Sequence, residues 1–327
     1  MKEKIIKKLL DMGLDNHGFM KPKSLESSYA YFKERKDKGY DTTFEEREID
    51  KKIDLTSHMS NVKTIISVAF PYYYDSYLHG KGYFSLYTLG KDYHLVVKDY
   101  LEQVANLIRE AGYEAHVFCD NNGLPERYIA YTAGVGDIGR NHMLVTRTHG
   151  SYVFLGEIMT NLELEINNRP IDELFKYQVC GDCTNCLKAC PTKILGFDMY
   201  DTNRCLSYIT QNKEVTDEEM LLFKGRLFGC DTCQRVCPLN KGIKTSKIDE
   251  FKPRDYMKYP NLDDILDLSN QDFKKYKETS SGWRGKKLLQ RNAMIELIRR
   301  GERIEDERVQ TEYLKAYKHR LEELFPL

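Results

Sequence analysis

The sequence contains no apolar run that approaches the roughly eighteen residues needed to span a membrane. Its beginning, MKEKIIKKLLDMG, has the pattern of an amphipathic helix, and its apolar run is too short for a secretory signal. Fifty lysines and arginines balance fifty aspartates and glutamates, so the whole molecule is not a polyanion binder. No internal repeat or low-complexity tract is present. We therefore expect a cytoplasmic protein without membrane contact, in which any nucleic-acid surface is a local patch.

Cysteine is concentrated in one stretch, because eight of the nine cysteines lie between residues 180 and 238. The run CGDCTNCLKACP has the spacing C-x2-C-x2-C-x3-C-P, which bacterial ferredoxins use for iron–sulfur clusters. A second run, GCDTCQRVCP, has the spacing C-x2-C-x3-C-P, and Cys205 supplies the cysteine that it lacks. The pattern predicts two [4Fe–4S] clusters in a reducing compartment, which keeps the thiolates available for iron.

Ferredoxin spacing also predicts how the thiolates divide. Three cysteines two residues apart converge on one cluster, while the fourth, just before the proline, ligates the other. The first cluster is expected to take Cys180, Cys183, Cys186 and Cys237, and the second to take Cys190, Cys205, Cys230 and Cys233. Structural zinc sites and disulfides are the alternatives, although zinc ribbons need neither the third cysteine nor the proline.

Hydrophobic periodicity predicts the main helices and strands. The β-branched run 62–70 is typical of a buried strand, and 114–119 predicts a short strand that delivers Asp120. Helices are expected at 3–12, 92–111, 126–133 and 284–300, with another charged helix at the end of the chain. The segment between the first helix and the first strand is polar and charge-rich, and 241–272 is expected to be loop-like.

Gly134, Gly136 and Gly139 spell GxGxxG, which by itself is a weak signal for nicotinamide binding. A Rossmann site needs a strand before the motif and a helix after it. Here the glycines follow a predicted helix, and MLVTRTHGSYVFLGEI reads as two strands that turn at His149 and Gly150. The pattern argues against a nicotinamide site and leaves a loop against another large cofactor open.

A basic helix is expected near the C-terminus, because nine lysines or arginines and two glutamates lie between Phe273 and Arg300. Such a face is usually solvated, and contact with nucleic acid is the alternative.

Several stretches together resemble the epoxyqueuosine reductase family, cobalamin and iron–sulfur enzymes that perform the last step of queuosine synthesis in tRNA. The resemblance covers about residues 60 to 240. It is carried by GKDYH (90–94), Asp120 with Arg127, AGVGDIGRNHML, GSYVFLGEI, RCLSYIT (204–210) and the two cysteine runs. Reductive dehalogenases share the cofactor plan. The resemblance implies an α/β cobalamin-binding domain (1–168), a bacterial ferredoxin-like 2×[4Fe–4S] domain (169–245) and a short helical C-terminal region (246–327).

The resemblance also implies roles for single residues. Asp120 matches the family's proton donor and Arg127 a supporting position, whereas the alternatives are a turn residue and a surface arginine. To donate a proton near neutral pH, Asp120 needs an apolar site that raises its pKa. Cobalamin contacts are expected from Tyr93, His94, Gly136, Gly139 and Ser207, with no histidine below the cobalt because DxHxxG is absent. tRNA contacts are expected from Arg284, Lys286, Lys287 and Arg291.

The chain departs from the family pattern at three places. Asn121 and Asn122 follow the aspartate where the family has serine or threonine and glycine, Asp137 replaces a tryptophan, and the C-terminal region is short. The expected function is conversion of epoxyqueuosine to queuosine in tRNA by a monomer that receives electrons from a donor such as a flavodoxin or ferredoxin. A related reductase of a small molecule and a cluster-only electron carrier are the alternatives. The long segment before the first cluster cysteine counts against a mere carrier.

Overall fold

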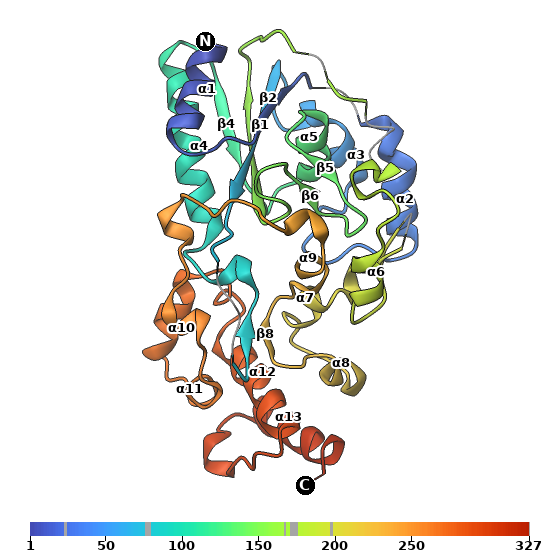
Figure 1. The fold of residues 1–327 in the computed structure, drawn as a ribbon, viewed down its shortest axis with the longest axis vertical. Helices are drawn as coiled ribbons and strands as arrows, with labels where there is room; N and C mark the ends of the chain where they lie inside the picture. The colour runs from blue at the N-terminus through green and yellow to red at the C-terminus, as the bar shows by residue number, and fades with distance from the viewer. Residues whose placement is uncertain (23–24, 76–79, 167, 171–175, 197–198, 327) are drawn as a thin grey trace. The chain divides into compact units, whose positions relative to one another are not determined.

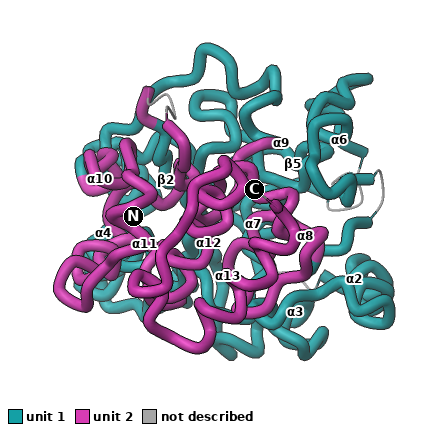
Figure 2. The backbone as a smooth tube through the Cα atoms, turned by 90° about the horizontal axis from the view of Figure 1, so that it is seen from below, with its two compact units in different colours: residues 1–73, 93–203, 233–249 teal, residues 74–92, 204–232, 250–327 magenta. Residues whose placement is uncertain are grey.

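The structure is a computed structural model that describes residues 1–22, 25–75, 80–166, 168–170, 176–196 and 199–326. The chain divides into two compact units, each assembled from separate stretches (Figure 2). Unit 1 contains residues 1–73, 93–203 and 233–249, and unit 2 contains 74–92, 204–232 and 250–327. The three consecutive domains expected from the sequence stay a prediction. No helix in the described part of the chain is long and apolar enough to cross a membrane.

Unit 1 is built around a four-stranded sheet in the order β1-β2-β7-β4, with every neighbouring pair antiparallel (Figure 1). Its strands are β1 (His17–Met20), β2 (Thr64–Pro71), β4 (Ala115–Phe118) and β7 (Val153–Thr160). Every residue of β2 is buried, as the near-continuous apolar run predicts for a strand covered on both faces. The two strands predicted from the sequence before Asp120 are therefore confirmed.

Helices cover both faces of this sheet (Figure 1). α4 (Tyr93–Glu110) packs on β7 and β4, and α1 (Lys2–Asp11) packs on α4. A side chain at Gly156 of β7 would collide with Val97 and Leu101 of α4, which explains the glycine. α5 (Glu126–Thr132) contacts β1, β2 and β7, and its Ile129 shares a core cluster with Leu155 and Met159.

The rest of unit 1 consists of short elements. They are α2 (Tyr29–Asp37), α3 (Ile49–Ile53), β5 (Asp137–Ile138), β6 (Leu144–Val145), α6 (Asn185–Ala189) and α9 (Thr232–Arg235), which crosses the unit boundary. The two expected strands and the turn at His149 and Gly150 are present, since β6 and β7 flank this segment and Thr146 forms an isolated bridge with Gly150. The two strands do not pair with each other, because β6 pairs with β5 and β7 pairs with β2 and β4.

Unit 2 is mainly helical. Its two short strands, β3 (Tyr83–Phe84) and β8 (Arg226–Phe228), pair in parallel. Its helices are α7 (Leu206–Ile209), α8 (Asp217–Leu221), α10 (Asp255–Lys258), α11 (Leu262–Leu266), α12 (Lys286–Arg299) and α13 (Glu312–Leu324). The two C-terminal helices are confirmed, whereas the expected loop 241–272 contains α10 and α11. Apolar residues of these helices, such as Ile265, are buried. A helix of about one turn is too short for a hydrophobic periodicity to be recognised in the sequence.

Candidate functional site

The first predicted set of cysteines surrounds one pocket in unit 1. Cys180 ends a short 3-10 helix, Cys186 lies on α6, and Cys237 directly precedes another 3-10 helix. These three residues and Cys183 line the same pocket, together with the segments 139–141 and 237–239. Burial and, second to it, the neighbouring Cys180 raise the pKa of Cys186 to about 11. A bound iron cluster would stabilise the four cysteines as thiolates, so the donor set fits a [4Fe–4S] cluster.

The second predicted set is divided between the units. Cys190 and Cys233 belong to unit 1, and Cys205 and Cys230 belong to unit 2. Two of these sulfurs contact threonine hydroxyls, since Cys190 Sγ lies 3.4 Å from Thr192 Oγ1 and Cys230 Sγ lies 3.3 Å from Thr232 Oγ1. The assignment of these four cysteines to one cluster stays a prediction.

Asp120 lies on a strained loop that directly follows strand β4. Its backbone φ of 43° and that of Asn121, 42°, fall in the left-handed region, which non-glycine residues seldom adopt and which often marks functional loops. The hydroxyl of Tyr93 donates to Asp120 Oδ2, and His94 Nε2 lies 3.3 Å from the same oxygen. Both partners come from the first turn of α4, so the sheet and this helix place one carboxylate between two aromatic donors.

These donors reverse the direction of the pKa shift that the sequence led us to expect for Asp120. Burial by itself raises the pKa of Asp120, but the hydrogen bonds from His94 and Tyr93 outweigh burial and hold the pKa below its ordinary value. The expectation of a raised pKa is therefore wrong. The side chain of Asp120 also remains 50 % exposed. An apolar environment is not what surrounds it here.

Arg127 is a partly buried residue of α5 and not the surface arginine of the alternative interpretation. Its guanidinium donates to the backbone carbonyl of His142. The neighbouring Tyr200 raises the pKa of Arg127 above its ordinary value, so the side chain stays charged. Burial and the positive charges of Arg127 and Arg35 lower the pKa of His142 to about 3, and this imidazole is therefore neutral.

Glu126 begins helix α5 and lines the same pocket as Asp120 and Arg127. Its Oε1 accepts the backbone N–H of Asp120 at 2.6 Å and Nδ2 of Asn122 at 3.1 Å. Burial and the negative charge of Asp120 raise the pKa of Glu126 to about 7. The sequence analysis missed this residue, although its place six positions after Asp120 at a predicted helix start was a usable signal.

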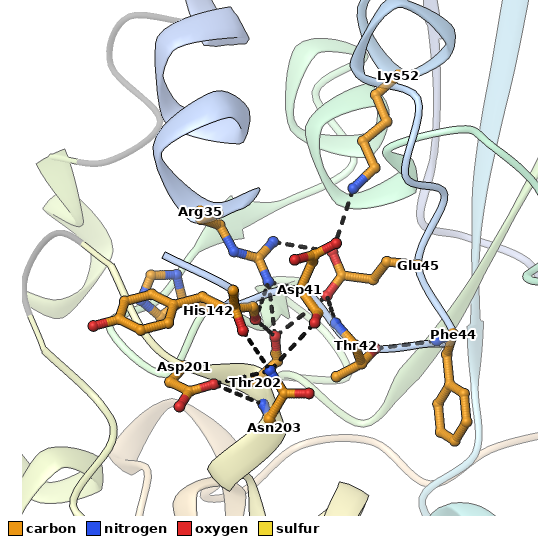
Figure 3. Close-up of polar contacts among 12 residues, drawn as sticks. Arg35, Asp41, Thr42, Phe44, Glu45, Lys52, His142, Asp201, Thr202 and Asn203 are labelled. Atoms are coloured by element: carbon orange, nitrogen blue, oxygen red, sulfur yellow. Dashed lines mark hydrogen bonds and ion pairs between the residues drawn. The ribbon is translucent and has the colours of Figure 1, made fainter. Parts of the chain in front are cut away.

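A second group that the sequence did not indicate is a charged network from the polar segment before β2 (Figure 3). Arg35 of α2 is only 5 % exposed and forms an ion pair with Glu45 at 3.0 Å. Lys52 lies 3.4 Å from the same carboxylate, and Arg35 also donates to Thr202 Oγ1 at 2.8 Å. Arg35, Glu45 and Lys52 line the pocket of about 260 Å³ that contains Asp120 and Glu126. This pocket is therefore polar and charged.

The residues expected to contact cobalamin separate into two groups. Tyr93 and His94 stack on each other with ring centroids 4.1 Å apart, and both contact Asp120. In contrast, Gly136 and Gly139 are explained by their own surroundings. A side chain at Gly136 would collide with the Val145 carbonyl, and one at Gly139 would crowd Asn141.

Tyr93 also stacks on Phe154 with ring centroids 4.2 Å apart, so its ring already packs on two protein rings, and cobalamin contacts of Tyr93 and His94 stay predictions. Gly139 lines the cysteine pocket, in which a side chain at this position would lie 3.6 Å from Cys180 Sγ. Ser207 lies on α7 in unit 2, where its backbone carbonyl accepts from Thr210 and Gln211. Cobalamin contacts of the glycines and of Ser207 stay predictions.

The expected basic face of α12 is wrong, because all residues from 288 to 298 are buried. Arg291 is 0 % exposed and donates to the carbonyls of Asn212 and Lys213 and to Tyr313. It is a structural residue, and its predicted contact with a phosphate is wrong. Counting lysines and arginines cannot distinguish an exposed charge from a buried one that donates to backbone carbonyls.

Three basic residues remain near the beginning of α12. Lys287 is exposed, and Arg284 and Lys286 are partly buried. Lys286 donates to the Leu268 carbonyl at 3.3 Å, and the guanidinium of Arg284 lies over the exposed Trp283 ring at 4.1 Å. Contact between these three residues and tRNA stays a prediction.

Comparison with protein families gives two matches in this chain. Residues 52–121 match the family described as "Epoxyqueuosine reductase QueG, DUF1730", and residues 179–240 match a "4Fe-4S double cluster binding domain". The second match contains all eight cysteines of the two predicted sets and favours iron–sulfur clusters over zinc or disulfides.

The chain is also similar to characterised relatives over most of its length. It is 36 % identical to the epoxyqueuosine reductase of Lactococcus garvieae over 308 residues, which cover 91 % of this chain and 86 % of the relative. A crystal structure of epoxyqueuosine reductase with an epoxyqueuosine-modified tRNA-Tyr stem loop matches with a TM-score of 0.82 and 33 % identity, covering 90 % of this chain and 80 % of that one. The Streptococcus thermophilus epoxyqueuosine reductase matches with a TM-score of 0.88 and 30 % identity, covering 98 % and 89 %.

Proposed function

The chain belongs to the epoxyqueuosine reductase family, and from this premise we propose that it converts epoxyqueuosine to queuosine within tRNA. The observation that carries the proposal is the composition of unit 1. This one unit contains the pocket of four cysteines and, on the loop after β4, a carboxylic acid with two aromatic donors and a charged pocket. Electron relay and proton delivery are the two capacities that this reaction needs.

Removal of the epoxide oxygen as water consumes two electrons and two protons. The two cysteine sets given above would hold two [4Fe–4S] clusters, which would supply single electrons. Cobalamin, when bound, would supply a strongly reduced metal for removal of the epoxide oxygen. Tyr93 and His94, which stack beside Asp120, are the residues proposed to face it.

Asp120 is proposed to deliver a proton to the departing epoxide oxygen. Its loop is strained and its side chain is half exposed, so the carboxyl can reach a bound substrate. A structure of the Bacillus subtilis epoxyqueuosine reductase is described with its catalytic aspartate loop swung out of the active site. A mobile acid of this kind fits the position of Asp120.

The charges around the pocket favour a modified nucleotide over a small apolar substrate. Charged side chains of both signs line one cavity, among them Arg127 and Glu126 and the paired residues Arg35 and Glu45. A base splayed from a single-stranded loop can be read by such groups, and lysines or arginines outside the pocket hold its phosphates. Arg284, Lys286 and Lys287 are the proposed phosphate contacts.

The remaining partners are proposed on the same basis. An external one-electron donor such as a flavodoxin or ferredoxin reduces the clusters, and the enzyme acts as a monomer in the cytoplasm, where tRNA is modified.

The experiment that tests this function is mass spectrometry of tRNA nucleosides from a strain that lacks the gene. Epoxyqueuosine should accumulate and queuosine should disappear, and a plasmid copy of the wild type should restore queuosine. Normal queuosine in the deletion strain would remove the proposal. A plasmid copy of Asp99→Asn should also restore queuosine, because Asp99 is an exposed aspartate of α4. If a copy of Asp120→Asn does not restore it, the function is connected to this site.

A further inference from the structure

The proton supply at Asp120 is smaller than the number of protons that the reaction consumes. If the proposed function is correct, each turnover takes two protons, and Asp120 can carry one at a time. Moreover, Asp120 is ionised at neutral pH in the structure described here, because Tyr93 and His94 donate to its carboxylate and keep its pKa low. The Tyr93 hydroxyl and His94 Nε2 already hold protons against this carboxylate, and a further acid beside the Asp120 loop would add to this supply.

Glu126 is in the right place to be this acid. Its carboxylate is tied to the Asp120 loop, since Oε1 accepts the Asp120 N–H at 2.6 Å and Nδ2 of Asn122 at 3.1 Å. Asn122 Nδ2 also donates to the Asp120 carbonyl at 2.8 Å, so hydrogen bonds connect Asp120, Asn122 and Glu126 within one turn of the chain. Glu126 and Asp120 line the same pocket, which provides a route for protons from solvent.

A fully buried carboxyl, that of Glu157, interacts electrostatically with Glu126. Glu157 of β7 is 0 % exposed and is opposite Ser67 of β2 and Phe118 of β4 in the sheet. Alternation along β7 places it on the same face as Leu155 and Met159, which is the face that α5 covers. Ser67 Oγ donates to Glu157 Oε1 at 3.0 Å, while Oε2 has no hydrogen-bond partner among the described residues.

The charged groups around this pair favour keeping one or both carboxyls neutral. Burial and the Glu126 charge hold the pKa of Glu157 well above its ordinary value, and burial and Asp120 act in the same direction on Glu126. The nearest cation to Glu126 is Arg127, which is directed to the His142 carbonyl. Of the other charged groups lining the pocket, Arg35 and Lys52 are paired with Glu45, and Glu46 is a further acid.

We propose that Glu126 is the proton store of this site, which reprotonates Asp120 during turnover, and that Glu157 is a second buried acid coupled to it. In the transfer, the O–H bond of Glu126 breaks as an O–H bond forms on Asp120. Asp120 then gives its proton to the oxygen that leaves as water, and solvent restores the proton of Glu126 through the pocket. Glu126 acts through Asp120 and is a positioning and proton-supplying residue.

The first test needs no substrate or cofactor. The full-length chain, labelled with ¹³C at glutamate carboxyls, is titrated by difference infrared spectroscopy for wild type, Glu126→Gln and Glu163→Gln. Glu163 is an exposed glutamate with an ion pair to Lys63, so its loss is the matched control. Wild type and Glu163→Gln should show a protonated glutamate at neutral pH that Glu126→Gln lacks. Equal protonated signals in all three proteins would overturn the proposal.

The second test uses the cofactor-loaded enzyme and its tRNA substrate. Glutamine keeps the acceptor oxygen for the Asp120 N–H but has no proton to give, so Glu126→Gln should turn over about 10-fold more slowly or worse. The alkaline limb of its pH–rate profile should shift, whereas a merely structural role leaves that limb in place. Glu126→Asp keeps an ionisable group and should recover part of both effects. It also decides the question if the glutamine variant does not fold.

The two tests fail separately. If the wild type leaves epoxyqueuosine unchanged, the proposed function falls while the infrared titration still reports whether Glu126 is protonated. If the wild type is active and Glu126→Gln retains its rate and pH profile, only the proton store is contradicted.

Discussion

Two buried or partly buried glutamates, each on a helix, show how the two units use charge differently. Glu296 of α12 in unit 2 is 1 % exposed and receives hydrogen bonds from Arg299 at 2.7 Å and Arg300 at 2.6 Å. Glu126 of α5 in unit 1 receives hydrogen bonds from a backbone N–H and an amide. A carboxylate held by two guanidinium groups anchors its helix, whereas a carboxyl that accepts only from neutral donors and is desolvated can hold a proton. Burial and the partner together determine which carboxyl is available for chemistry.

The same contrast applies to the arginines of the two units. Arg291 in unit 2 is fully buried and donates to backbone carbonyls of its own unit, so it is part of the core. Arg127 in unit 1 donates to the His142 carbonyl and lines a charged pocket. We therefore expect substitutions in the core of unit 2 to change stability and substitutions around Asp120 to change turnover.

The largest effect should come from Arg291→Met, which removes the hydrogen bonds of a fully buried guanidinium to two backbone carbonyls and to Asn292 Oδ1. Hydrogen bonds that involve a charged group contribute about 1.5–3 kcal/mol each, so the variant should lose about 3 kcal/mol or more of unfolding free energy. Urea-induced unfolding measures this loss. Arg308→Met is the control, because its ion pairs with Asp263 and Asp267 are partly exposed and should contribute about 1 kcal/mol or less. Equal losses would break the contrast.

The next effect concerns turnover alone. Asp120→Asn should reduce the turnover number by at least about 10²-fold, the usual scale for a positioned acid, while iron and cobalamin contents stay normal. Asp99→Asn should behave like wild type, since Asp99 is exposed on α4. Single-turnover assays on tRNA measure both. A near-normal rate for Asp120→Asn would leave Asp120 as a turn residue.

The pH dependence of stability tests Glu126 in a different way. Burial and Asp120 raise the pKa of Glu126 from 4.5 to about 7, so the unfolded chain ionises this group first as the pH rises. Ionisation then favours the unfolded state, and the folded protein loses about 2 kcal/mol between about pH 5 and about pH 8. Glu126→Gln should lose this part of the pH dependence. If the unfolding free energies of wild type and variant differ by the same amount at both pH values, the pKa of this carboxyl is not perturbed.

The smallest effect should come from the remaining basic residues of unit 2. Lys287→Ala removes one exposed charge at the beginning of α12, and the salt dependence of tRNA binding should fall by about one phosphate contact. Lys315→Ala is the control, because Lys315 is an exposed lysine of α13 that pairs with Glu312. Identical salt slopes for both variants and wild type would remove Lys287 from the proposed surface.

The sequence predicted the parts of the molecule that depend on local patterns. Cysteine spacing identified the set that surrounds one pocket, and long apolar periodicity located β2, α4 and α12. It did not predict that α12 is buried, because the sequence does not distinguish an arginine such as Arg291, which donates to carbonyls distant in the chain, from a solvent-exposed arginine.

The parts that depend on contacts between distant residues were missed. Arg35 and Glu45 come from a charge-rich segment without periodicity, and only the fold brings them to the pocket of Asp120. The pKa of Asp120 was predicted in the wrong direction, because its donors Tyr93 and His94 lie on another element. Family resemblance supplied the position of the acid but not its surroundings.

The measurement that tests the central claim most directly is conversion of the modified nucleoside by the purified protein. The chain is purified anaerobically, loaded with its clusters and cobalamin, supplied with a one-electron reductant and incubated with tRNA that contains epoxyqueuosine. Nucleoside mass spectrometry should show queuosine formed with the wild type and little with Asp120→Asn. Unchanged epoxyqueuosine, in a wild-type preparation with full iron and cobalamin contents, would contradict the claim.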